Sequence, residues 1–398
     1  MGSFLAVPAA QRVPERWEIP HGVTSRRARE RGTGTYFVTI PARISNLACN
    51  LPSSLAAHIA DAETALASFD EHSFATFGAL GQALGPMSSI LLRSESASSS
   101  QIENLTVGAR QLALAELNEN TSSHASLVLG NVRSMEAALS LAKSLDVEAL
   151  LAMNAALLPD GGRLRESLVW VGSSSFSPVG AAHVAPHASE VPEALEDLLM
   201  FARRTDMPVL LQAAIAHAQF ETIHPFVDGN GRVGRALVHA MLAHHGLVTS
   251  TTVPISGDLL RNTKRYFDAL TAYREGNAAP IIECFADAAL VSAHDGRKLA
   301  VHLSRIAREA EDTLRNAGVR RHSYAYRLVQ VLVGQPVVNT AFVREELGVN
   351  TSVAQRAITT LTEHGILVER TGRKRGRVWH CTAIIDALED YAEHSRRA

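Results

Sequence analysis

Twelve consecutive residues carry side chains suited to phosphate chemistry, in the run HPFVDGNGRVGR at positions 224–235. His224 titrates near neutrality unaided and can accept a proton from a hydroxyl. Asp228 offers hard oxygen ligands of the kind that hold Mg²⁺ on phosphates. Arg232 and Arg235 lie three residues apart, so a helix would place both on one side of its first turn. The run therefore indicates a base beside a phosphate site.

The glycines of this run indicate how a phosphate would be held. Gly229-Asn230-Gly231 allows a sharp turn that points main-chain N–H groups into one cavity. The segment 233–245 is mostly apolar and contains no proline, which predicts a helix after the turn. The N-terminus of such a helix favours an anion.

The complete run distinguishes this segment from an ordinary turn. An Asp-Gly/Asn-Gly pair alone is equally typical of a plain connection between two helices. HPFVDGNGRVGR, however, resembles the signature of the Fic (filamentation induced by cAMP) family, His-Pro-Phe-x-(Asp/Glu)-Gly-Asn-Gly-Arg-x-x-Arg, without a departure. The resemblance extends over roughly residues 36–295. It implies a mainly α, helical Fic core and a protein adenylyltransferase, which transfers AMP from ATP to a Ser, Thr or Tyr hydroxyl.

The resemblance also implies a role for each polar residue of the run. His224 is the base, Asp228 holds Mg²⁺, the loop amides with Gly229, Asn230 and Gly231 bind the α-phosphate, and Arg232 and Arg235 hold the β- and γ-phosphates. Tyr266, further along, either lies by the nucleotide base or belongs to the core. Self-modification is an expectation from the family, and some relatives remove AMP instead.

A second motif lies upstream, at Ser99, Glu103 and Asn104. From the residues alone, Ser100-x-x-Glu103 predicts a capping box for a helix that runs on through Leu112. Ser-x-x-x-Glu-Asn also resembles the inhibitory motif of Fic proteins that carry an inhibitor helix ahead of the core. The resemblance implies that Glu103 pairs with Arg235 and keeps that arginine from the γ-phosphate.

A hairpin is predicted between the helices of the core, at residues 169–186. Val169 to Val171 and Ala182 to Pro186 have strand character and flank a serine- and glycine-rich loop. In Fic proteins the equivalent flap holds the target protein by strand addition, and the alternative is a hairpin without a function. His183 and His187 are expected on the flap surface.

Composition restricts the class of protein. The chain has 398 residues, 46% hydrophobic and 20% charged, and a net charge of −2, so global basicity does not indicate nucleic acid. The three cysteines are scattered, which is typical of a reducing compartment. No apolar run reaches the ~18 residues of a membrane span, and no signal peptide is evident, so we expect a cytoplasmic protein without a membrane partner. A homodimer is left open.

The pattern divides the chain into five consecutive parts. We expect a flexible N-terminal arm with a basic run at 26–31, a region carrying the inhibitor helix, the catalytic core, a connecting helix and a winged-helix domain, at residues 1–35, 36–110, 111–297, 298–317 and 318–398. The basic run favours a solvated arm over a nucleic-acid contact.

The C-terminal part suggests a second hypothesis. Two short helices precede a basic turn, and the second helix, with Arg356, would be the recognition helix of a winged helix. Arg373, Lys374 and Arg375 in the turn could contact DNA phosphates. The alternatives are a winged helix that binds protein, or a DNA-binding regulator that uses the Fic core as a nucleotide sensor. The complete motif at 224–235 favours the enzyme, because a sensor has no need of His224.

Overall fold

The chain divides into two compact units, each assembled from segments far apart in sequence. The computed structural model describes residues 4–19, 25–78, 85–119, 122–370 and 376–397. Unit 1 comprises Met1–Asp61, Arg133–Gly246 and Thr263–Ala286, and unit 2 comprises Ala62–Val132, Leu247–Asn262 and Asp287–Ala398. The segments of the two units alternate along the chain. The five consecutive parts expected from the sequence therefore do not correspond to these units. Helices α2 (Ser53–Gly78), α5 (Ser123–Ser140) and α12 (Ala279–Asn316) contribute residues to both units.

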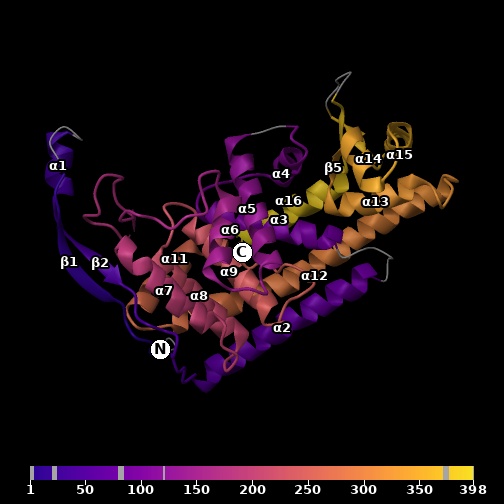
Figure 1. Ribbon diagram of the computed structural model, residues 1–398. Coiled ribbons are helices and arrows are strands. Elements are labelled where there is room, and N and C mark those ends of the chain that lie inside the picture. The colour runs from indigo at the N-terminus through magenta and orange to yellow at the C-terminus, as the bar shows by residue number, and fades with distance from the viewer. Residues whose placement is uncertain (1–3, 20–24, 79–84, 120–121, 371–375, 398) are drawn as a thin grey trace. The chain divides into compact units, whose positions relative to one another are not determined.

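Unit 1 begins with a β-ribbon where a loop-like arm was expected. Strand β1 (Gln11–Trp17) pairs antiparallel with β2 (Gly34–Ile40), and helix α1 (Arg26–Gly32) lies between them in sequence (Figure 1). The basic run thus forms a helix, capped by the Ser25 side chain, which accepts from the Ala28 amide. The expectation of a loop was wrong for these residues, because β1 gains its hydrogen bonds from a partner strand that local patterns do not reveal.

The core of unit 1 is helical, and its central helix is buried on every side. Helix α8 (Val209–Ile223) has no exposed face from Leu210 to Ile223, although it includes polar residues such as Gln212, His217 and Glu221. It packs closely on α9 (Asn230–His244). The remaining helices are α6 (Val147–Leu157), the 3₁₀ turn η1 (Ala188–Glu190), α7 (Val191–Ala202) and α11 (Thr263–Arg274).

The predicted hairpin is present as two very short strands. Strand β3 (Trp170–Val171) pairs antiparallel with β4 (His183–Val184). Tyr36 and Val38 of the ribbon form an apolar cluster with Val184, and Trp17 packs against it. The ribbon therefore supports the hairpin from one side.

Unit 2 contains the segment with the upstream motif and the C-terminal part of the chain. The connecting helix expected at 298–317 is not a separate element, since α12 is one helix of 38 residues. No proline follows Pro280 in this segment, so the helix continues past the expected boundary. The other helices of the first part are α3 (Gly85–Ile102), α4 (Ala109–Glu116) and α10 (Ser256–Arg261).

The C-terminal elements follow the order that the sequence predicted. They are α13 (Tyr324–Gly334), β5 (Val337–Asn339), α14 (Thr340–Leu347), α15 (Thr351–Glu363), β6 (Val368–Glu369), β7 (Val378–His380) and α16 (Thr382–Arg397). The sheet order is β5-β7-β6. Val337, Val378 and Ile385 form one core cluster with Ala113 of α4, so these elements pack within unit 2. The winged-helix assignment stays a prediction.

In the part of the chain that the structure describes, no helix is both long and apolar enough to span a membrane.

Candidate functional site

His224 lies at the junction of the two central helices of unit 1. It caps the C-terminus of α8 with left-handed backbone angles, φ 51° and ψ 63°, and its amide donates to the Phe220 carbonyl at 2.8 Å. Pro225 follows and prevents the helix from continuing. A left-handed residue other than glycine is strained and persists only where its surroundings fix it. The chain thus turns sharply at the candidate base.

The imidazole of His224 is held as a neutral base. Its Nδ1 atom lies 3.4 Å from the main-chain carbonyl of Glu221, which can only accept, so Nδ1 carries the proton and Nε2 keeps a lone pair. Burial lowers the pKa of His224 to about 4, and the charges of Arg274 and Arg165 lower it as well. The Glu221 carbonyl and Asp228 act in the opposite direction. At neutral pH the ring is therefore uncharged and able to accept a proton.

Arg165 fixes the backbone on which His224 stands. Its Nε donates to the His224 carbonyl at 2.8 Å, and its Nη2 donates to the carbonyls of Ile223 and Pro186. The bonds to Ile223 and His224 satisfy carbonyls that the end of α8 leaves without helical partners. The bond to Pro186 connects the hairpin region to the same guanidinium. The side chain is buried, and burial lowers the pKa of Arg165 to about 10, so the guanidinium remains charged. No local pattern in the sequence pointed to this residue.

The turn before α9 is shaped by side chains that bind main-chain groups. Asn230 receives the Phe226 amide at 2.9 Å and donates to the Phe226 carbonyl at 2.9 Å, so its side chain closes the loop. Asn154 of α6 donates to the Asp228 carbonyl at 3.2 Å. Gly229 has φ 81°, and a Cβ there would stand 2.5 Å from Leu157 Cδ2. Asn154 was not predicted, because its partner lies 74 residues away.

The charged residues of the turn differ in their exposure. The side chain of Asp228 is 68% exposed, whereas that of Arg232 is 3% exposed and lies 3.4 Å from Asp228 Oδ1. Arg235 is buried in the next turn of α9. The amides of the first turn of α9 start beside Asp228, where an anion would meet the positive end of the helix dipole.

Asp228 fits Mg²⁺ only together with a phosphate ligand. No cluster of three His, Cys, Asp or Glu side chains occurs within the described ranges of the chain. Mg²⁺ is commonly held by one or two carboxylates plus phosphate oxygens and water. One exposed carboxylate next to an anion site is consistent with that mode and not with a metal cage made by protein alone.

Tyr266 belongs to the core of unit 1. It is 1% exposed, its hydroxyl lies 2.6 Å from His217 Nε2, and the two rings stack. Burial lowers the pKa of His217 to about 3, so this ring is neutral. Of the two alternatives for Tyr266, the structure favours the core.

His183 was expected on the flap surface, and this expectation was wrong. The ring is buried, with Nε2 at 3.0 Å from the Thr222 carbonyl and Nδ1 at 3.3 Å from Thr39 Oγ1. Its centroid lies 6.2 Å from that of His224. Strand β2 and the end of α8, distant in sequence, enclose it. His187 is partly exposed and lies 2.6 Å from Glu15 Oε1.

Residues 144–242 match the model of the Fic/DOC family. This segment of the chain is similar to the Fic/DOC family. A probable protein adenylyltransferase of Aquifex aeolicus is 32% identical over 120 residues, which are 30% of this chain and 32% of the relative. The protein adenylyltransferase Fic of Drosophila willistoni is 28% identical over 131 residues, 32% of this chain and 23% of the relative. The chain thus spans about a third or less of the length of these curated relatives.

The fold agrees with this assignment. A Fic family protein from Desulfovibrio desulfuricans superposes with a TM-score of 0.50 over 81% of this chain and 95% of that one. The sequence identity is 20%, so the likeness concerns the fold alone. The predicted class, mainly α with a Fic core and a short hairpin, is confirmed.

The upstream motif lies outside residues 144–242, in unit 2, and its helix differs from the predicted one. Ser99 and Ser100 are in the last turn of α3, which ends at Ile102, and Asn104 has a left-handed φ of 64°. The Leu105 amide returns to the Ser100 carbonyl at 3.0 Å. The capping box was therefore wrong: the motif ends a helix instead of starting one. Glu103 and Arg235 belong to different units, and their pairing stays a prediction.

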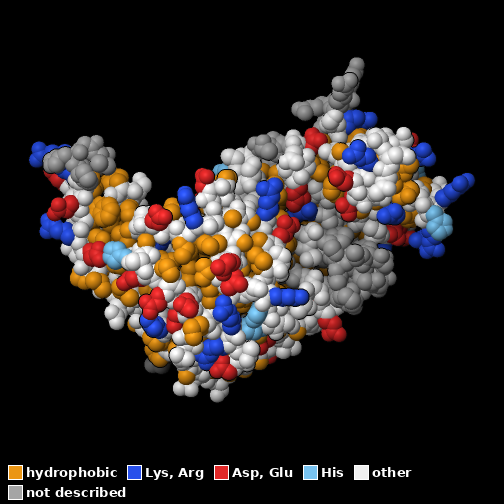
Figure 2. Space-filling model, in the orientation of Figure 1, with side chains coloured by type: hydrophobic (Ala, Val, Ile, Leu, Met, Phe, Trp, Pro, Cys, Tyr) orange, Lys and Arg blue, Asp and Glu red, His pale blue; other side chains and the backbone are white. Residues whose placement is uncertain are grey.

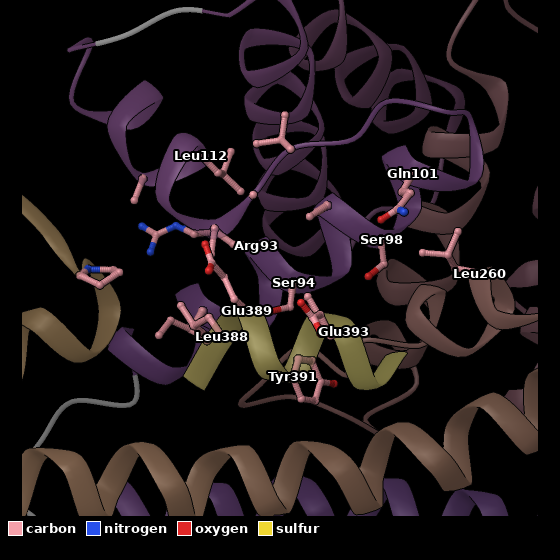
Figure 3. Close-up of a pocket in the computed structure, with 18 residues that line it drawn as sticks. Arg93, Ser94, Ser98, Gln101, Leu112, Leu260, Leu388, Glu389, Tyr391 and Glu393 are labelled. Atoms are coloured by element: carbon pink, nitrogen blue, oxygen red, sulfur yellow. The ribbon is translucent and has the colours of Figure 1, made fainter. Parts of the chain in front are cut away.

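One face of α3, with Ser94, Ser98 and Gln101, borders a cavity of about 200 Å³ within unit 2. Figure 3 shows Ser94, Ser98 and Gln101 of α3 on one side of it, with Glu389 and Tyr391 of α16 opposite. Ser96 and Ser100 of α3 are buried instead and bind Asn131, which donates to Ser100 Oγ at 3.1 Å and to the Ser96 carbonyl at 2.8 Å.

The residues predicted to contact DNA are only partly described. Arg356 is exposed on α15. Arg373, Lys374 and Arg375 lie outside the described residues. Lys and Arg side chains over α13–α15 are interspersed with acidic ones on the face that Figure 2 shows. DNA contact stays a prediction.

Proposed function

We propose that this chain is a protein adenylyltransferase that transfers AMP from ATP to a Ser, Thr or Tyr hydroxyl of a target protein. The proposal rests on one observation: His224, neutral and held by the hydrogen bond from Arg165 to its carbonyl, lies directly before the turn that precedes α9. A base and an anion site are thereby placed at the two ends of one short loop. The Fic domain and the names of its relatives support this chemistry.

The chemical step uses the free Nε2 lone pair of His224. The acceptor hydroxyl loses its proton to Nε2 as its oxygen attacks the α-phosphorus of ATP. A bond forms between that oxygen and phosphorus, the bond to the β-phosphate oxygen breaks, and pyrophosphate leaves. Arg165 keeps the His224 carbonyl in place during this step, which preserves the direction of the ring.

The phosphates would be bound by the turn and by α9. The amides of Asn230 and Gly231 would face the developing charge on the α-phosphate, while Arg232 and Arg235 would neutralise the β- and γ-phosphates. The Gly229 amide donates to Asp228 Oδ1 at 2.6 Å, so it would reach a phosphate only if that bond opens. The Asn230 side chain maintains the shape of the loop, because both of its polar groups bind Phe226. Mg²⁺, held by Asp228 and the phosphates, supplies charge neutralisation when bound.

Regulation by the upstream motif is part of the proposal. Glu103 follows the last turn of α3, and that turn is anchored by Asn131. A carboxylate at this position would compete with the γ-phosphate for Arg235. The hairpin of residues 169–186 would hold the target segment by strand addition, and the side chain of Val171 on β3 is exposed.

Labelled ATP tests the transfer directly. Purified protein is incubated with ATP carrying ³²P in the α-position, together with a lysate, in wild type, His224→Ala and Glu103→Gly forms. We expect label transfer to rise in Glu103→Gly and to fall by about 10²–10⁴-fold in His224→Ala. His322→Ala, a change on the surface of unit 2, is the matched control.

Two other activities give different results in this assay. Loss of label from a premodified target, dependent on Glu103, would indicate removal of AMP. Absence of transfer even in Glu103→Gly, combined with ATP binding and a salt-sensitive DNA complex, would favour the DNA-binding regulator.

A further inference from the structure

The last main-chain carbonyls of α8 accept hydrogen bonds from side chains, because a helix end leaves them without helical partners. They belong to Glu221, Thr222, Ile223 and His224. Arg165 donates to the carbonyls of Ile223 and His224, and the His224 ring donates to that of Glu221. The remaining carbonyl, that of Thr222, is bound by His183 of strand β4. The hairpin strand itself thus takes part in ending the helix that carries the candidate base.

The neighbours of His183 define its tautomer. Its Nε2 atom lies 3.0 Å from the Thr222 carbonyl, which can only accept, so Nε2 carries the proton. Its Nδ1 atom lies 3.3 Å from Thr39 Oγ1 and accepts from that hydroxyl. Burial holds the pKa of His183 well below its usual range, and the charge of Arg274 acts in the same direction, so the ring is neutral. Two directed hydrogen bonds therefore join this strand to β2 and to the end of α8.

The ring of His183 also contacts that of the candidate base. Its centroid lies 6.2 Å from that of His224, and the two planes meet at 72°, an edge-to-face arrangement. The carbonyl that His183 binds directly follows the one that fixes the tautomer of His224, that of Glu221. If the bond to Thr222 were lost, the last turn of α8 would be free to fray, and the bond between His224 and Glu221 would weaken with it.

Arg165 holds the hairpin only outside its strands. The guanidinium binds the carbonyls of Ser167 and Pro186, which precede β3 and follow β4. His183 lies in β4 itself, opposite Val171 of β3. Each strand has two residues, and so short a hairpin is not stable by its own pairing. The position of β4 relative to α8 therefore depends on side-chain contacts such as that of His183.

We propose that His183 is a positioning residue, which fixes strand β4 to the end of α8 and thereby sets the distance between the hairpin and His224. The inference rests on the proposed transfer of AMP to a protein hydroxyl. A target segment added to the hairpin takes its position from the backbone of the hairpin. The hydroxyl has to reach within about 3 Å of the base, and a misplacement of about 1 Å costs on the order of 10²-fold in rate.

Two substitutions separate the hydrogen bond of His183 from its packing. His183→Phe keeps a flat ring in the buried site but cannot donate to Thr222, whereas the amide of His183→Gln can donate in place of Nε2. Both are made in Glu103→Gly protein and incubated with α-labelled ATP and a desalted lysate. We expect kcat for label transfer to fall about 10–100-fold in His183→Phe and to stay within about threefold in His183→Gln. The KM for ATP should not change, because the hydrogen bonds of His183 go to Thr39 and Thr222.

His187→Gln is the matched control for these variants. His187 lies further along the same segment, is partly exposed, and bonds Glu15 of β1 and not α8. Its replacement should leave kcat unchanged. A loss equal to that of His183→Phe would mean that any weakening of this region lowers transfer, which overturns the specific role of the bond to Thr222. An unchanged kcat in His183→Phe overturns it too.

The ring tautomers provide a readout that needs no catalysis. Long-range ¹H–¹⁵N spectra of ¹⁵N-histidine-labelled protein report which ring nitrogen carries the proton, and each signal is identified from its loss in His183→Phe or His224→Ala. We expect Nε2–H for His183 and Nδ1–H for His224 in wild type, and a His224 signal averaged between both tautomers in His183→Phe.

The spectra and the transfer assay fail in different ways. Nδ1–H for His183 in wild type, or an unchanged His224 signal in His183→Phe, overturns the positioning role. If the tautomers are as expected but Glu103→Gly labels no protein, the proposed transfer fails and the positioning of His224 by His183 stands.

Discussion

The Nε atom of Arg165 donates a hydrogen bond of 2.8 Å to the main-chain carbonyl of His224. This bond joins the start of the hairpin region to the end of α8, 59 residues further along the chain. The guanidinium also holds the carbonyls of Ser167, Pro186 and Ile223. One buried cation thereby fixes the backbone of the candidate base His224 and the start of the hairpin region together.

Replacing Arg165 should cost both stability and activity. Arg165→Gln leaves buried carbonyls without donors, so we expect the free energy of unfolding to fall by roughly 2–4 kcal/mol. Urea denaturation measures this change. Arg16→Gln, with an exposed side chain, should stay within about 0.5 kcal/mol. If Arg165→Gln is equally neutral, these hydrogen bonds do not hold the loop.

The pH dependence of transfer should follow His224. Its pKa of about 4 means that the base is unprotonated above that value, so kcat/KM should stay level from pH 8 down to about 5 and fall below it. Arg274 and Arg165 lower this pKa, while Glu221 and Asp228 raise it. Arg274→Gln should therefore move the acidic limb upward, toward the ordinary value of 6.5. An unchanged limb in this variant would contradict the electrostatic account.

Gly229 is required for two reasons that can be separated. Alanine at this position has to adopt φ 81° and places a Cβ 2.5 Å from Leu157 Cδ2. Gly246, also in unit 1, has φ 73°, but a Cβ added there would have no atom within 4 Å from the described residues beyond its chain neighbours. Gly246→Ala should cost about 1–2 kcal/mol, the cost of the left-handed backbone alone. Gly229→Ala should cost more and also weaken ATP binding, as measured by calorimetry.

The sequence was sufficient to predict those parts of the candidate site whose residues lie in one continuous run. Residues 224–235 predicted a base, a turn and a following helix, and the structure has His224, Gly229 and α9 in that order. It was insufficient where the role of a residue depends on contacts with residues distant in sequence. Ser100-x-x-Glu103 satisfies the pattern of a helix start, yet Ser100 lies in the last turn of α3, which ends at Ile102. The Ser100 side chain accepts from Asn131, a partner distant in sequence.

The same limit applies to His183 and to β1. A histidine in a two-residue strand has no periodicity that reveals its burial, and its partners Thr39 and Thr222 come from other elements. Strand β1 contains Pro14, so its local signal is that of a loop, and it is a strand because it pairs with β2. Both features arise from tertiary contacts, which local sequence patterns do not contain.

Acid should destabilise the protein through its buried histidines. His217 is fully buried with a pKa of about 3, below the value of 6.5 for an exposed ring. Between these values the unfolded chain binds a proton that the folded chain does not, so stability is present above pH 6.5 and is lost as the pH falls toward 3. From about pH 7 to about pH 5 this residue alone contributes a loss of about 2 kcal/mol. His217→Gln should reduce the measured pH dependence by that amount, and equal slopes in urea titrations would exclude this role.

Tyr266→Phe decides between the two roles of this residue. Its hydroxyl bonds His217 Nε2 at 2.6 Å inside the core, so removal of the hydroxyl should lower the free energy of unfolding by about 1 kcal/mol. The KM for ATP should change less than about twofold, because a side chain that is 1% exposed offers no surface to a nucleotide. Thermal unfolding and steady-state kinetics on the same preparation supply both values. A KM raised about tenfold with unchanged stability would instead place Tyr266 at the nucleotide base.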